Sequence, residues 1–490
     1  MSAGASRTDK RIGIVVVAYN AASTLAQVLD RIPPAFVPQI SDVLVCDDAS
    51  QDATFLVGLG YQQVSELPLT IIRREQNLGY GGNQKAAYEW AIEHGLDIVV
   101  LLHGDGQYAP EHLPKMVEPL LAGECDAVLG SRMMEKGAAR RGGMPLYKFV
   151  GNRILTTVQN AVVGADLSEW HSGYRAYSVA ALRDIPFAQN HDGFDFDTQI
   201  IIQLIEAGKR IVEVPIPTYY GDEICYVDGV GYARDVVVDS LRYRAHKIGL
   251  GSGDAAFASR DYELKDGDIS SHGQIVQWLT TSRPLRVLDL GCAGGSLAAE
   301  LRKHGHTVVG VDVEETEGVR DRVDEFVQRD LDHGLGDAVP GAFDVVLAAD
   351  VLEHVRDPDE LLADARRVLA PEGIVVACVP NFGHWYARLR VASGTFAYER
   401  RGILDAGHVR FFTRRSFDRV VRTAGYSIVR RRSLGVPFEV IGRGGRNEPR
   451  RFARVFGAID RAAVAVWPTM FAYQFLVELR PTTRAATPRE

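Results

Sequence analysis

Val287-Leu-Asp-Leu-Gly-Cys-Ala-Gly-Gly295 is the stretch of this chain that best predicts its fold. The apolar residues at its start have the length of a buried strand, and its glycines form a turn before a helical pattern over Ser296–Lys303. Asp312 ends the next apolar run, 17 residues after Gly295. A strand, a glycine-rich turn, a helix and an acidic residue at this spacing are typical of a nucleotide-binding α/β domain.

Similar alternation extends in both directions from this stretch. Short apolar runs alternate with helical patterns in both halves of the chain, which predicts two parallel sheets covered on both faces. The expected strands are 12–18, 43–46, 69–72, 98–102 and 127–129 in the first half, and 286–290, 307–311, 343–348 and 374–379 in the second. A chain of 490 residues exceeds the size of one ordinary core. The Gly/Ser/Ala-rich segment 247–260 is the predicted linker between domains at 10–246 and 261–482.

Composition limits the partners and the compartment. The net charge of -8 argues against a nucleic-acid partner. The five cysteines lie far apart without a CxxC pair, which favours free thiols in a reducing cytoplasm. No apolar run reaches the roughly 18 residues of a membrane span. We therefore expect a cytoplasmic protein, with the inner face of the membrane as an alternative site, because Arg451–Arg461 interleaves basic and apolar residues.

The first half carries two acidic motifs at strand ends, Val43-Leu-Val-Cys-Asp-Asp48 and Leu101-Leu-His-Gly-Asp-Gly-Gln107. Open parallel sheets bind ligands at the carboxyl ends of their strands. A carboxylate there can accept hydrogen bonds from a base or from ribose hydroxyls. Asp105 lies between two glycines, which allow a diphosphate to approach closely, and its carboxylate suits a hard divalent cation.

Five short segments of the first half form an ordered set: Ala18-Tyr-Asn20, Asp47-Asp-Ala-Ser-Gln-Asp52, Asn77-Leu-Gly79, Asp105-Gly-Gln107 and Gly130-Ser-Arg132. In this set, residues 10–240 resemble the inverting family 2 glycosyltransferases, and within them the dolichyl-phosphate mannosyltransferase and polyprenyl-phosphate sugar transferase branch. The resemblance implies a GT-A fold, a nucleotide-diphosphate sugar donor, Mg²⁺ or Mn²⁺, and a lipid-phosphate or glycan acceptor. It implies that the donor contacts Tyr19, Asn20, Asp48, Asn77, Gly79 and Arg132, and the metal Asp105 and Gln107.

The chain departs from the family pattern at two positions. Ala18 stands where the family usually has Pro, and His103 stands where the family has the first Asp of its metal motif. His103 either reaches a metal-bound water or packs at the sheet edge. Metal binding is expected to be weaker or shifted in consequence.

The family's acceptor side corresponds to Trp170–Tyr177 and Gly193–Thr198. Inverting transfer needs a carboxylate base unless the acceptor is already a phosphate anion. Asp195 and Asp197 alternate with phenylalanines, so on an extended chain both carboxylates face one way. If this stretch instead enters a helix, Asp197 becomes an N-cap. Arg132 and Arg175 are candidates for contacting phosphates, since guanidinium groups match phosphate oxygens.

In the second half, the acidic Asp289 lies just before the glycine turn. A carboxylate at this position would repel a pyrophosphate but suits a cationic sulfonium ligand. Residues 261–480 resemble the class I S-adenosylmethionine-dependent methyltransferases. The resemblance implies that the cofactor contacts Asp289, Gly291, Gly294, Gly295, Asp312 and Asp330.

A general base is needed only if the methyl acceptor is a hydroxyl. His384 and His408 are the candidates, with ordinary surface histidines as the alternative interpretation. The chain is thus interpreted as a bifunctional enzyme that transfers a sugar with inversion and methylates a glycan or envelope precursor. The alternative is an active glycosyltransferase joined to a module that binds S-adenosylmethionine without catalysis.

Overall fold

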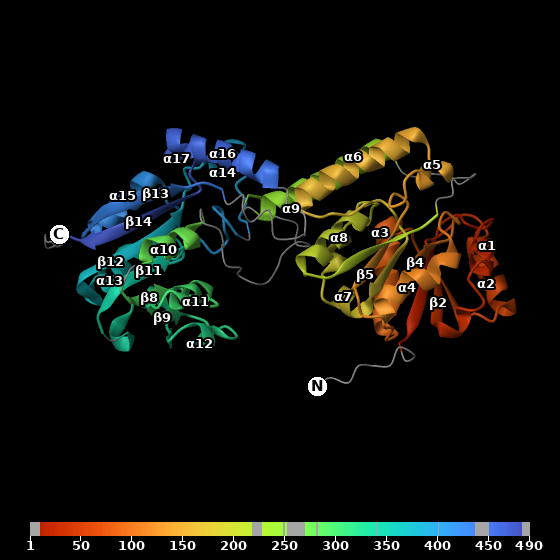
Figure 1. Cartoon of the computed structure of the whole chain (residues 1–490), viewed down its shortest axis with the longest axis horizontal. Helices are drawn as coiled ribbons and strands as arrows, with labels where there is room; N and C mark the ends of the chain where they lie inside the picture. Colours follow the sequence, from red (N-terminus) through yellow and green to blue (C-terminus); the bar gives the residue numbers. More distant parts are fainter. Residues whose placement is uncertain are drawn as a thin grey trace. The chain divides into compact units, whose positions relative to one another are not determined.

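The computed structural model describes residues 10–217, 228–247, 250–251, 270–280, 283–339, 341–399, 401–436 and 450–482. The chain divides into two compact units, one ending at Arg244 and the other beginning at Ala245 (Figure 1). Apart from residues 247, 250 and 251, the predicted linker 247–260 lies outside the described residues. The exact domain bounds therefore stay a prediction.

The first unit is built on a seven-stranded sheet of order β3-β2-β1-β4-β6-β5-β7. β6 runs antiparallel to both of its neighbours, whereas the other pairings are parallel. The expectation of a wholly parallel sheet is wrong here, because β6 (Arg-Ala-Tyr-Ser) is not an apolar run and so was not predicted as a strand. The bounds are β1 Ile12–Ala18, β2 Ile40–Asp47, β3 Leu69–Arg73, β4 Ile98–His103, β5 Ala127–Ser131, β6 Arg175–Ser178 and β7 Ile211–Pro215.

Helices cover both faces of this sheet, as predicted (Figure 1). Side chains alternate along β1, so that Ile14 and Val16 enter one apolar core while Val15 enters the other. The helices are α1 Leu25–Asp30, α2 Thr54–Val64, α3 Gly79–Glu93, α4 Leu113–Leu121, α5 Ala138–Arg141, α6 Leu146–Val163, α7 Val179–Arg183, α8 Phe196–Glu206 and α9 Gly229–Lys247, whose last three residues lie past the division at Arg244.

The second unit holds another seven-stranded sheet, of order β10-β9-β8-β11-β12-β14-β13. β14 pairs antiparallel with β12 and β13, so this sheet is also mixed rather than parallel. All the predicted strands of this half are present. The bounds are β8 Arg286–Leu290, β9 Thr307–Asp312, β10 Glu325–Gln328, β11 Phe343–Ala349, β12 Leu369–Pro380, β13 Tyr426–Leu434 and β14 Gln474–Pro481.

The helices of the second unit include the predicted one after the glycine turn, α11, at its predicted bounds. They are α10 Ser271–Leu279, α11 Ser296–Lys303, α12 Val319–Arg322, α13 Pro358–Arg367, α14 Trp385–Ala392, α15 Arg414–Thr423, α16 Arg450–Val466 and α17 Pro468–Phe471. The candidate membrane-contact segment 451–461 lies in α16, where the side chains of residues 451–456 are outside the described set. In the part of the chain that the structure describes, no helix combines the length and the apolarity needed to cross a membrane.

Strand order places the ligand sites. In the first sheet the order reverses between β1 and β4, and in the second it reverses between β8 and β11. Chains leave such adjacent parallel strands in opposite directions, which opens a crevice beyond their carboxyl ends. Asp105 follows β4 and Asp289 lies on β8 at these positions, whereas Asp48 and Asp312 lie at the ends of the neighbouring strands β2 and β9.

Candidate functional site

Asp48 organises the carboxyl edge of the first sheet. Its two carboxylate oxygens accept hydrogen bonds from the backbone N–H groups of Leu78 (2.8 Å) and Gly79 (3.1 Å). Gly79 has φ +80°, and a Cβ there would lie 2.7 Å from the Asp192 carbonyl oxygen, so only glycine fits. Asn77 donates to the Asp48 carbonyl oxygen at 3.2 Å. The structure thus brings Asp48, Asn77 and Gly79 together.

The turn after β1 lies at the same edge. Asn20 has a positive φ of 50°, and its side-chain oxygen accepts from the Gln51 N–H at 2.8 Å. Its own N–H donates to Ser50 Oγ at 2.9 Å. Tyr19 is 37% exposed beside it. These contacts hold the turn after β1 against the turn after β2, beside the partly exposed Tyr19.

Asp105 is exposed after β4, and its Oδ1 accepts from the backbone N–H of Gln107 at 2.9 Å. Among the described residues, neither Asp105 nor His103 belongs to a group of three His, Cys, Asp or Glu side chains close enough to hold an ion. An exposed carboxylate such as that of Asp105 suits a cation that is held by one or two carboxylates together with substrate phosphates, as Mg²⁺ usually is.

His103 packs at the sheet edge. Its Nε2 lies 3.3 Å from Tyr80 Oη, and its ring meets the Tyr108 ring edge-on at 4.9 Å. Burial lowers the pKa of His103, which favours the neutral imidazole. A Cβ on Gly173 would lie 2.5 Å from this ring. The described contacts favour the packing interpretation of His103 over a role on the metal.

Asp195 and Asp197 do not alternate on a strand, because they begin helix α8. Asp195 occupies the N-cap position and Asp197 lies in the first helical turn. The prediction of an extended segment is wrong. The alternative, an entry into a helix, is correct, but the N-cap is Asp195 rather than Asp197. A repeat of two over four residues is too short to separate a strand from a helix start.

Asp197 is buried in a polar cluster. It accepts hydrogen bonds from Tyr80 Oη (3.0 Å) and Gln84 Nε2 (3.3 Å) and pairs with Arg175 at 3.4 Å. Arg175 is 1% exposed and also donates to the carbonyl oxygens of Ser172, Trp170 and Asp197. Arg175 therefore holds the start of α8. Because its guanidinium group is buried, it is not accessible for the predicted contact with a phosphate.

Asp195 belongs to a second cluster. Its Oδ2 lies 2.5 Å from His191 Nδ1 and 3.4 Å from Gln199 Nε2. Gln199 also donates to Asp239 at 2.8 Å. Burial, followed by the Asp195 charge, raises the pKa of Asp239 to about 6. A half-exposed histidine on a buried carboxylate can accept and release a proton.

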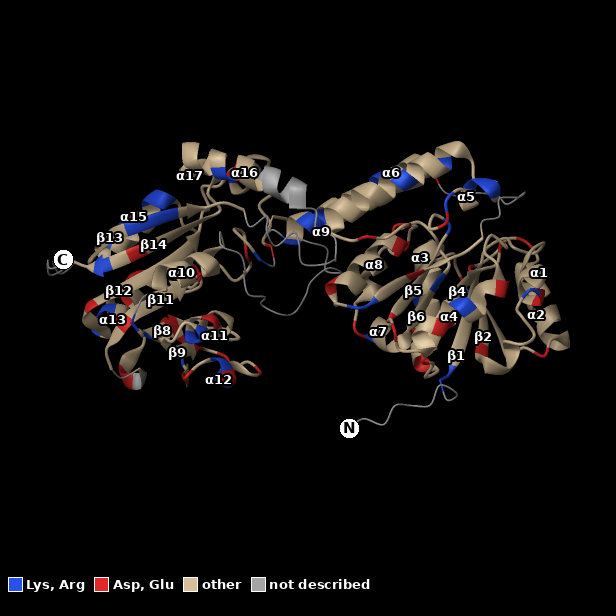
Figure 2. Ribbon diagram, viewed as in Figure 1, with Lys and Arg blue, Asp and Glu red and all other residues tan. Residues whose placement is uncertain are grey.

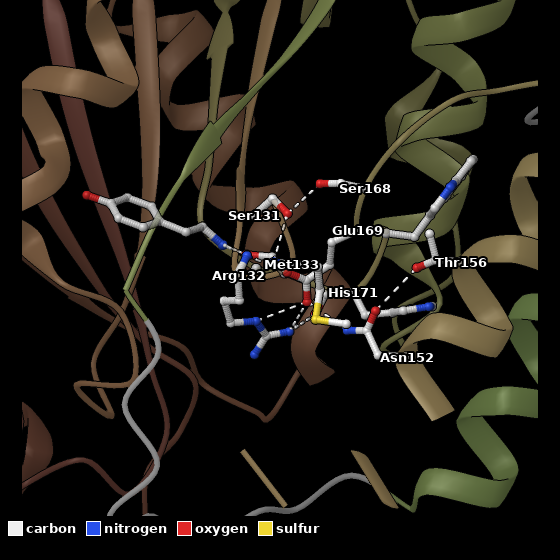
Figure 3. Close-up of polar contacts among 12 residues, drawn as sticks. Ser131, Arg132, Met133, Asn152, Thr156, Ser168, Glu169 and His171 are labelled. Atoms are coloured by element: carbon white, nitrogen blue, oxygen red, sulfur yellow. Dashed lines mark hydrogen bonds and ion pairs between the residues drawn. The ribbon is translucent and has the colours of Figure 1, made fainter. Parts of the chain in front are cut away.

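Arg132 forms an ion pair with the buried carboxylate of Glu169 (Figure 3). Its Nε donates to Glu169 Oε1 at 3.0 Å, and its backbone N–H donates to Oε2 at 2.7 Å. Asn152 donates to the same Oε1 at 2.7 Å. Although burial alone would raise it, the Arg132 charge holds the pKa of Glu169 below its ordinary value. This pair locks the segment after β5 onto Glu169, and Arg132 is only 6% exposed.

The glycine turn after β8 has the backbone of a ligand cradle. Positive φ angles occur at Gly291 (64°), Ala293 (46°) and Gly295 (71°). Asp312 Oδ2 accepts from the Ala293 N–H at 2.8 Å, and Arg322 donates to the Gly294 carbonyl oxygen at 2.7 Å. A Cβ on Gly291 would lie 2.7 Å from Val351. The turn therefore lies tightly between the ends of β9 and β11.

Asp289 lies beneath this turn, 3% exposed. Burial and then repulsion by Asp312 raise the pKa of Asp289 to about 7. A cationic ligand would offset both effects by stabilising the carboxylate, and a compound with sulfonium and ammonium groups supplies such a charge. The two acids therefore fit S-adenosylmethionine.

The remaining predicted residues have different surroundings. Asp330 is half-exposed, and its carboxylate accepts from the Asp332 N–H at 2.9 Å. His384 is fully buried as the N-cap of α14, and burial lowers its pKa to about 4. His408 is 7% exposed. The alternative of ordinary surface histidines is therefore wrong for both.

Sequence reasoning missed Glu169, Tyr80, Gln84 and His191. Tyr80 and Gln84 lie four residues apart, so the helical spacing could have placed them on one face of α3. No local pattern links Glu169 to Arg132, because their contact joins residues 37 positions apart.

Comparison with known proteins gives the family. A family model described as glycosyl transferase family 2 matches residues 13–185, and one described as a methyltransferase domain matches residues 272–431. The undecaprenyl-phosphate mannosyltransferase of Micrococcus luteus is 33% identical over 208 residues, which cover 42% of this chain and 82% of that protein. The polyprenol monophosphomannose synthase of Mycolicibacterium smegmatis is 28% identical over 211 residues, covering 43% of this chain and 78% of that protein.

The second half has relatives of its own. The ubiquinone biosynthesis O-methyltransferase of Caulobacter sp. is 35% identical over 105 residues, which cover 20% of this chain and 41% of that protein. The first unit carries the GT-A fold and the second the Rossmann-like methyltransferase fold. The chain belongs to glycosyl transferase family 2 and is fused to a methyltransferase domain, so that it is an enzyme with two transferase units.

Proposed function

We propose that the first unit transfers a sugar, with inversion, from a nucleotide-diphosphate sugar to a polyprenyl phosphate, and that the second methylates a glycan or envelope precursor with S-adenosylmethionine. The relative from Micrococcus luteus is named for undecaprenyl phosphate, and the relative from Mycolicibacterium smegmatis is named for polyprenol monophosphomannose. The main observation in support of the first activity is the carboxyl edge of the first sheet. There Asp48 holds the turn 77–79, and Asp105 follows β4. This edge combines hydrogen-bonding groups for a nucleotide with a carboxylate for a cation.

The surroundings of Asp197 support a phosphate acceptor. Its carboxylate is paired with Arg175 and accepts two further hydrogen bonds, so its oxygens already have partners within the protein. A phosphate oxygen attacks as an anion and needs no base. If the acceptor is instead a hydroxyl, His191 on Asp195 is the better proton acceptor.

Helix α6 supports a lipid-linked acceptor. Four apolar side chains of α6 are exposed: Leu146 61%, Tyr147 73%, Val150 45% and Ile154 58%. Arg140 and Arg141 form the basic end of α5 just before them (Figure 2). Apolar side chains beside basic ones suit an anionic membrane surface, where a polyprenyl phosphate is held.

In the donor site, a divalent cation on Asp105 would neutralise the charge that develops on the leaving diphosphate. Asp48 and Tyr19 would bind the nucleotide. In the second unit, Asp289 and Asp312 would bind the cationic cofactor. Methyl transfer is a direct displacement on a reactive donor, so positioning supplies much of the rate.

The test uses the full chain with Mn²⁺, a short-chain polyprenyl phosphate and a panel of uridine, guanosine and thymidine diphosphate sugars. One donor should give a labelled lipid-linked product and the nucleoside diphosphate. Asp105→Asn should reduce this transfer strongly, whereas Asp337→Asn, on the surface of the second unit, should leave it unchanged. Transfer to no lipid phosphate from any donor would contradict the proposal.

Methyl-labelled S-adenosylmethionine added to the lipid-linked product tests the second activity. Labelled product supports methylation of the first unit's product. Cofactor binding without turnover on any glycan or lipid-linked sugar would favour the alternative, a binding module without catalysis.

A further inference from the structure

Three side chains with metal-binding atoms meet near the glycine turn of the second unit. Glu353, His354 and His408 each offer a ligand atom, and these atoms lie within 4.8 Å of one another. Glu353 and His354 follow β11, while His408 comes from the segment before α15. Glu353 is 1% exposed and His408 7%, whereas His354 is exposed. The cluster is thus anchored in the protein and open on one side.

Both histidines are oriented through their Nδ1 atoms. His354 Nδ1 lies 3.0 Å from the Gly407 carbonyl oxygen, and His408 Nδ1 lies 3.3 Å from the Ile403 carbonyl oxygen. A carbonyl oxygen can only accept, so each Nδ1 carries a proton, and in the neutral ring Nε2 is then the nitrogen with the lone pair. Histidines that bind metals are held in this way, by an N–H donated to a carbonyl or a carboxylate.

The backbone fixes the two segments together. The Glu353 carbonyl oxygen accepts from the N–H groups of Val409 (2.9 Å) and Arg410 (3.0 Å). A Cβ on Gly407 would lie 3.2 Å from the His354 ring, so glycine lets the chain pass close to it. The arrangement of ligands is therefore held by hydrogen bonds and packing of the chain itself.

The cluster shares the edge of the sheet with the cofactor cradle. β11 pairs with β8 in parallel, with Ala348 beside Leu290. Val351 then packs on Gly291, and Glu353 follows two residues later. An ion at the cluster would thus lie at the same edge of the sheet as the glycine turn.

We propose that Glu353, His354 and His408 bind a divalent cation of the Mn²⁺ or Zn²⁺ class, which holds a hydroxyl group of the methyl acceptor. Two imidazoles and one carboxylate leave positions open for such an oxygen and suit these cations better than Mg²⁺. The inference rests on the proposed methyl transfer for its role, but not for the binding site.

The reaction balances without another reactant. Coordination to the cation acidifies the acceptor hydroxyl, whose proton passes to water. The oxygen then forms a bond to the methyl carbon, and the carbon–sulfur bond breaks. Its electron pair stays on sulfur, which changes from a sulfonium into a neutral thioether. This explains how a hydroxyl could react although the buried His384 is a poor base.

Cobalt tests the site directly in the full chain, stripped of metal beforehand. Co²⁺ bound to histidines in a site of low coordination absorbs visible light strongly, whereas Co²⁺ among oxygen ligands absorbs weakly. We expect a strong visible band that is lost in His354→Ala, which changes an exposed side chain, and in His408→Gln. The band should persist in His304→Ala, an exposed histidine of the same unit, and in Asp105→Asn. A missing band, or one unchanged in His354→Ala, would overturn the site.

Methyl transfer tests the role. Chelation should abolish methylation of a hydroxyl acceptor, and Mn²⁺ or Zn²⁺ should restore it, while calorimetric binding of S-adenosylmethionine persists throughout. Equal methylation after chelation would overturn the catalytic role. If no acceptor is methylated under any condition, the proposed methyl transfer fails, and the cobalt spectra alone decide whether the site exists.

Discussion

At the scale of single residues, the second unit keeps a buried acid in an unfavourable state. Asp289 is nearly inaccessible to water, and its pKa of about 7 reflects burial and repulsion by Asp312. Such an acid weakens the fold when ionised unless a cation accompanies it. The free-energy cost of ionising Asp289 is therefore expected to be offset when the cofactor binds.

This state predicts opposite pH dependences for folding and binding. Between about pH 4 and about pH 7 the folded chain without ligand holds a proton on Asp289 that the unfolded chain has released. Its contribution to the free energy of unfolding therefore falls as the pH rises through this range. S-adenosylmethionine prefers the carboxylate, so its affinity should rise by up to about tenfold per pH unit in the same range.

Calorimetric titration with S-adenosylmethionine between about pH 5 and about pH 8 measures this dependence. Asp289→Asn should bind the cofactor weakly and without the pH trend. An affinity of the unmodified chain that stays constant across the range would contradict the assignment of Asp289.

The Arg132–Glu169 pair predicts a large loss of stability. Glu169→Ala leaves a buried guanidinium without its carboxylate, which should lower the free energy of unfolding by about 3–5 kcal/mol. Glu111→Ala is the matched control, because it breaks the partly exposed Arg31–Glu111 pair and should cost below about 1 kcal/mol. Urea denaturation of the three proteins measures both values. Equal losses would show that burial does not determine the strength of the Arg132 pair.

At the scale of elements, the N-terminal ends of α3 and α8 position several of the predicted site residues of the first unit. The N-terminal turn of α3 is held by Asp48, and the Gly81 N–H donates to the Asp192 carbonyl oxygen at 2.7 Å. The segment before α8 therefore rests on α3. In this way the predicted donor motif and the predicted acceptor motif become neighbours although they lie more than 100 residues apart.

The exposed face of α6 predicts a contact with membranes. Ile154→Asp should weaken binding to anionic lipid vesicles at least about tenfold in co-sedimentation, since burying one such side chain contributes about 1.5–3 kcal/mol. Leu56→Asp, at the 67% exposed Leu56 of α2, is the matched control and should bind vesicles normally. Both variants should fold, because both side chains are exposed. Unchanged sedimentation of Ile154→Asp would exclude this face as the membrane contact.

At the scale of the whole molecule, each unit has its own sheet and apolar core, which predicts two unfolding transitions. A ligand that binds one folded unit stabilises that unit by about 2.7 kcal/mol at a concentration of 100 times its Kd. In calorimetric scans, S-adenosylmethionine should shift one transition, and the nucleoside diphosphate with Mn²⁺ the other. A single transition shifted by both ligands would contradict two independently stable units.

The sequence predicted the central strands and the glycine turn well because these features are local. An apolar run between turns indicates a strand, and a strand followed by glycines indicates a turn into a helix. β6 was not predicted because Arg175–Ser178 is not an apolar run, and the start of α8 was not predicted because four residues do not separate a period of two from a helix start. The strands β13 and β14 were also not predicted. Their antiparallel direction is defined only by the strands with which they pair.

The sequence by itself determined the two fold classes, the order of the units and the positions of the acidic motifs at strand ends. Only the tertiary structure decided which of those charged groups remain accessible. Arg132 and Arg175 pair with Glu169 and Asp197, which come from distant segments, whereas Asp105 stays exposed. The physical reason is that burial and charge pairing depend on contacts between segments far apart in the chain, and a sequence pattern reports only neighbours along it.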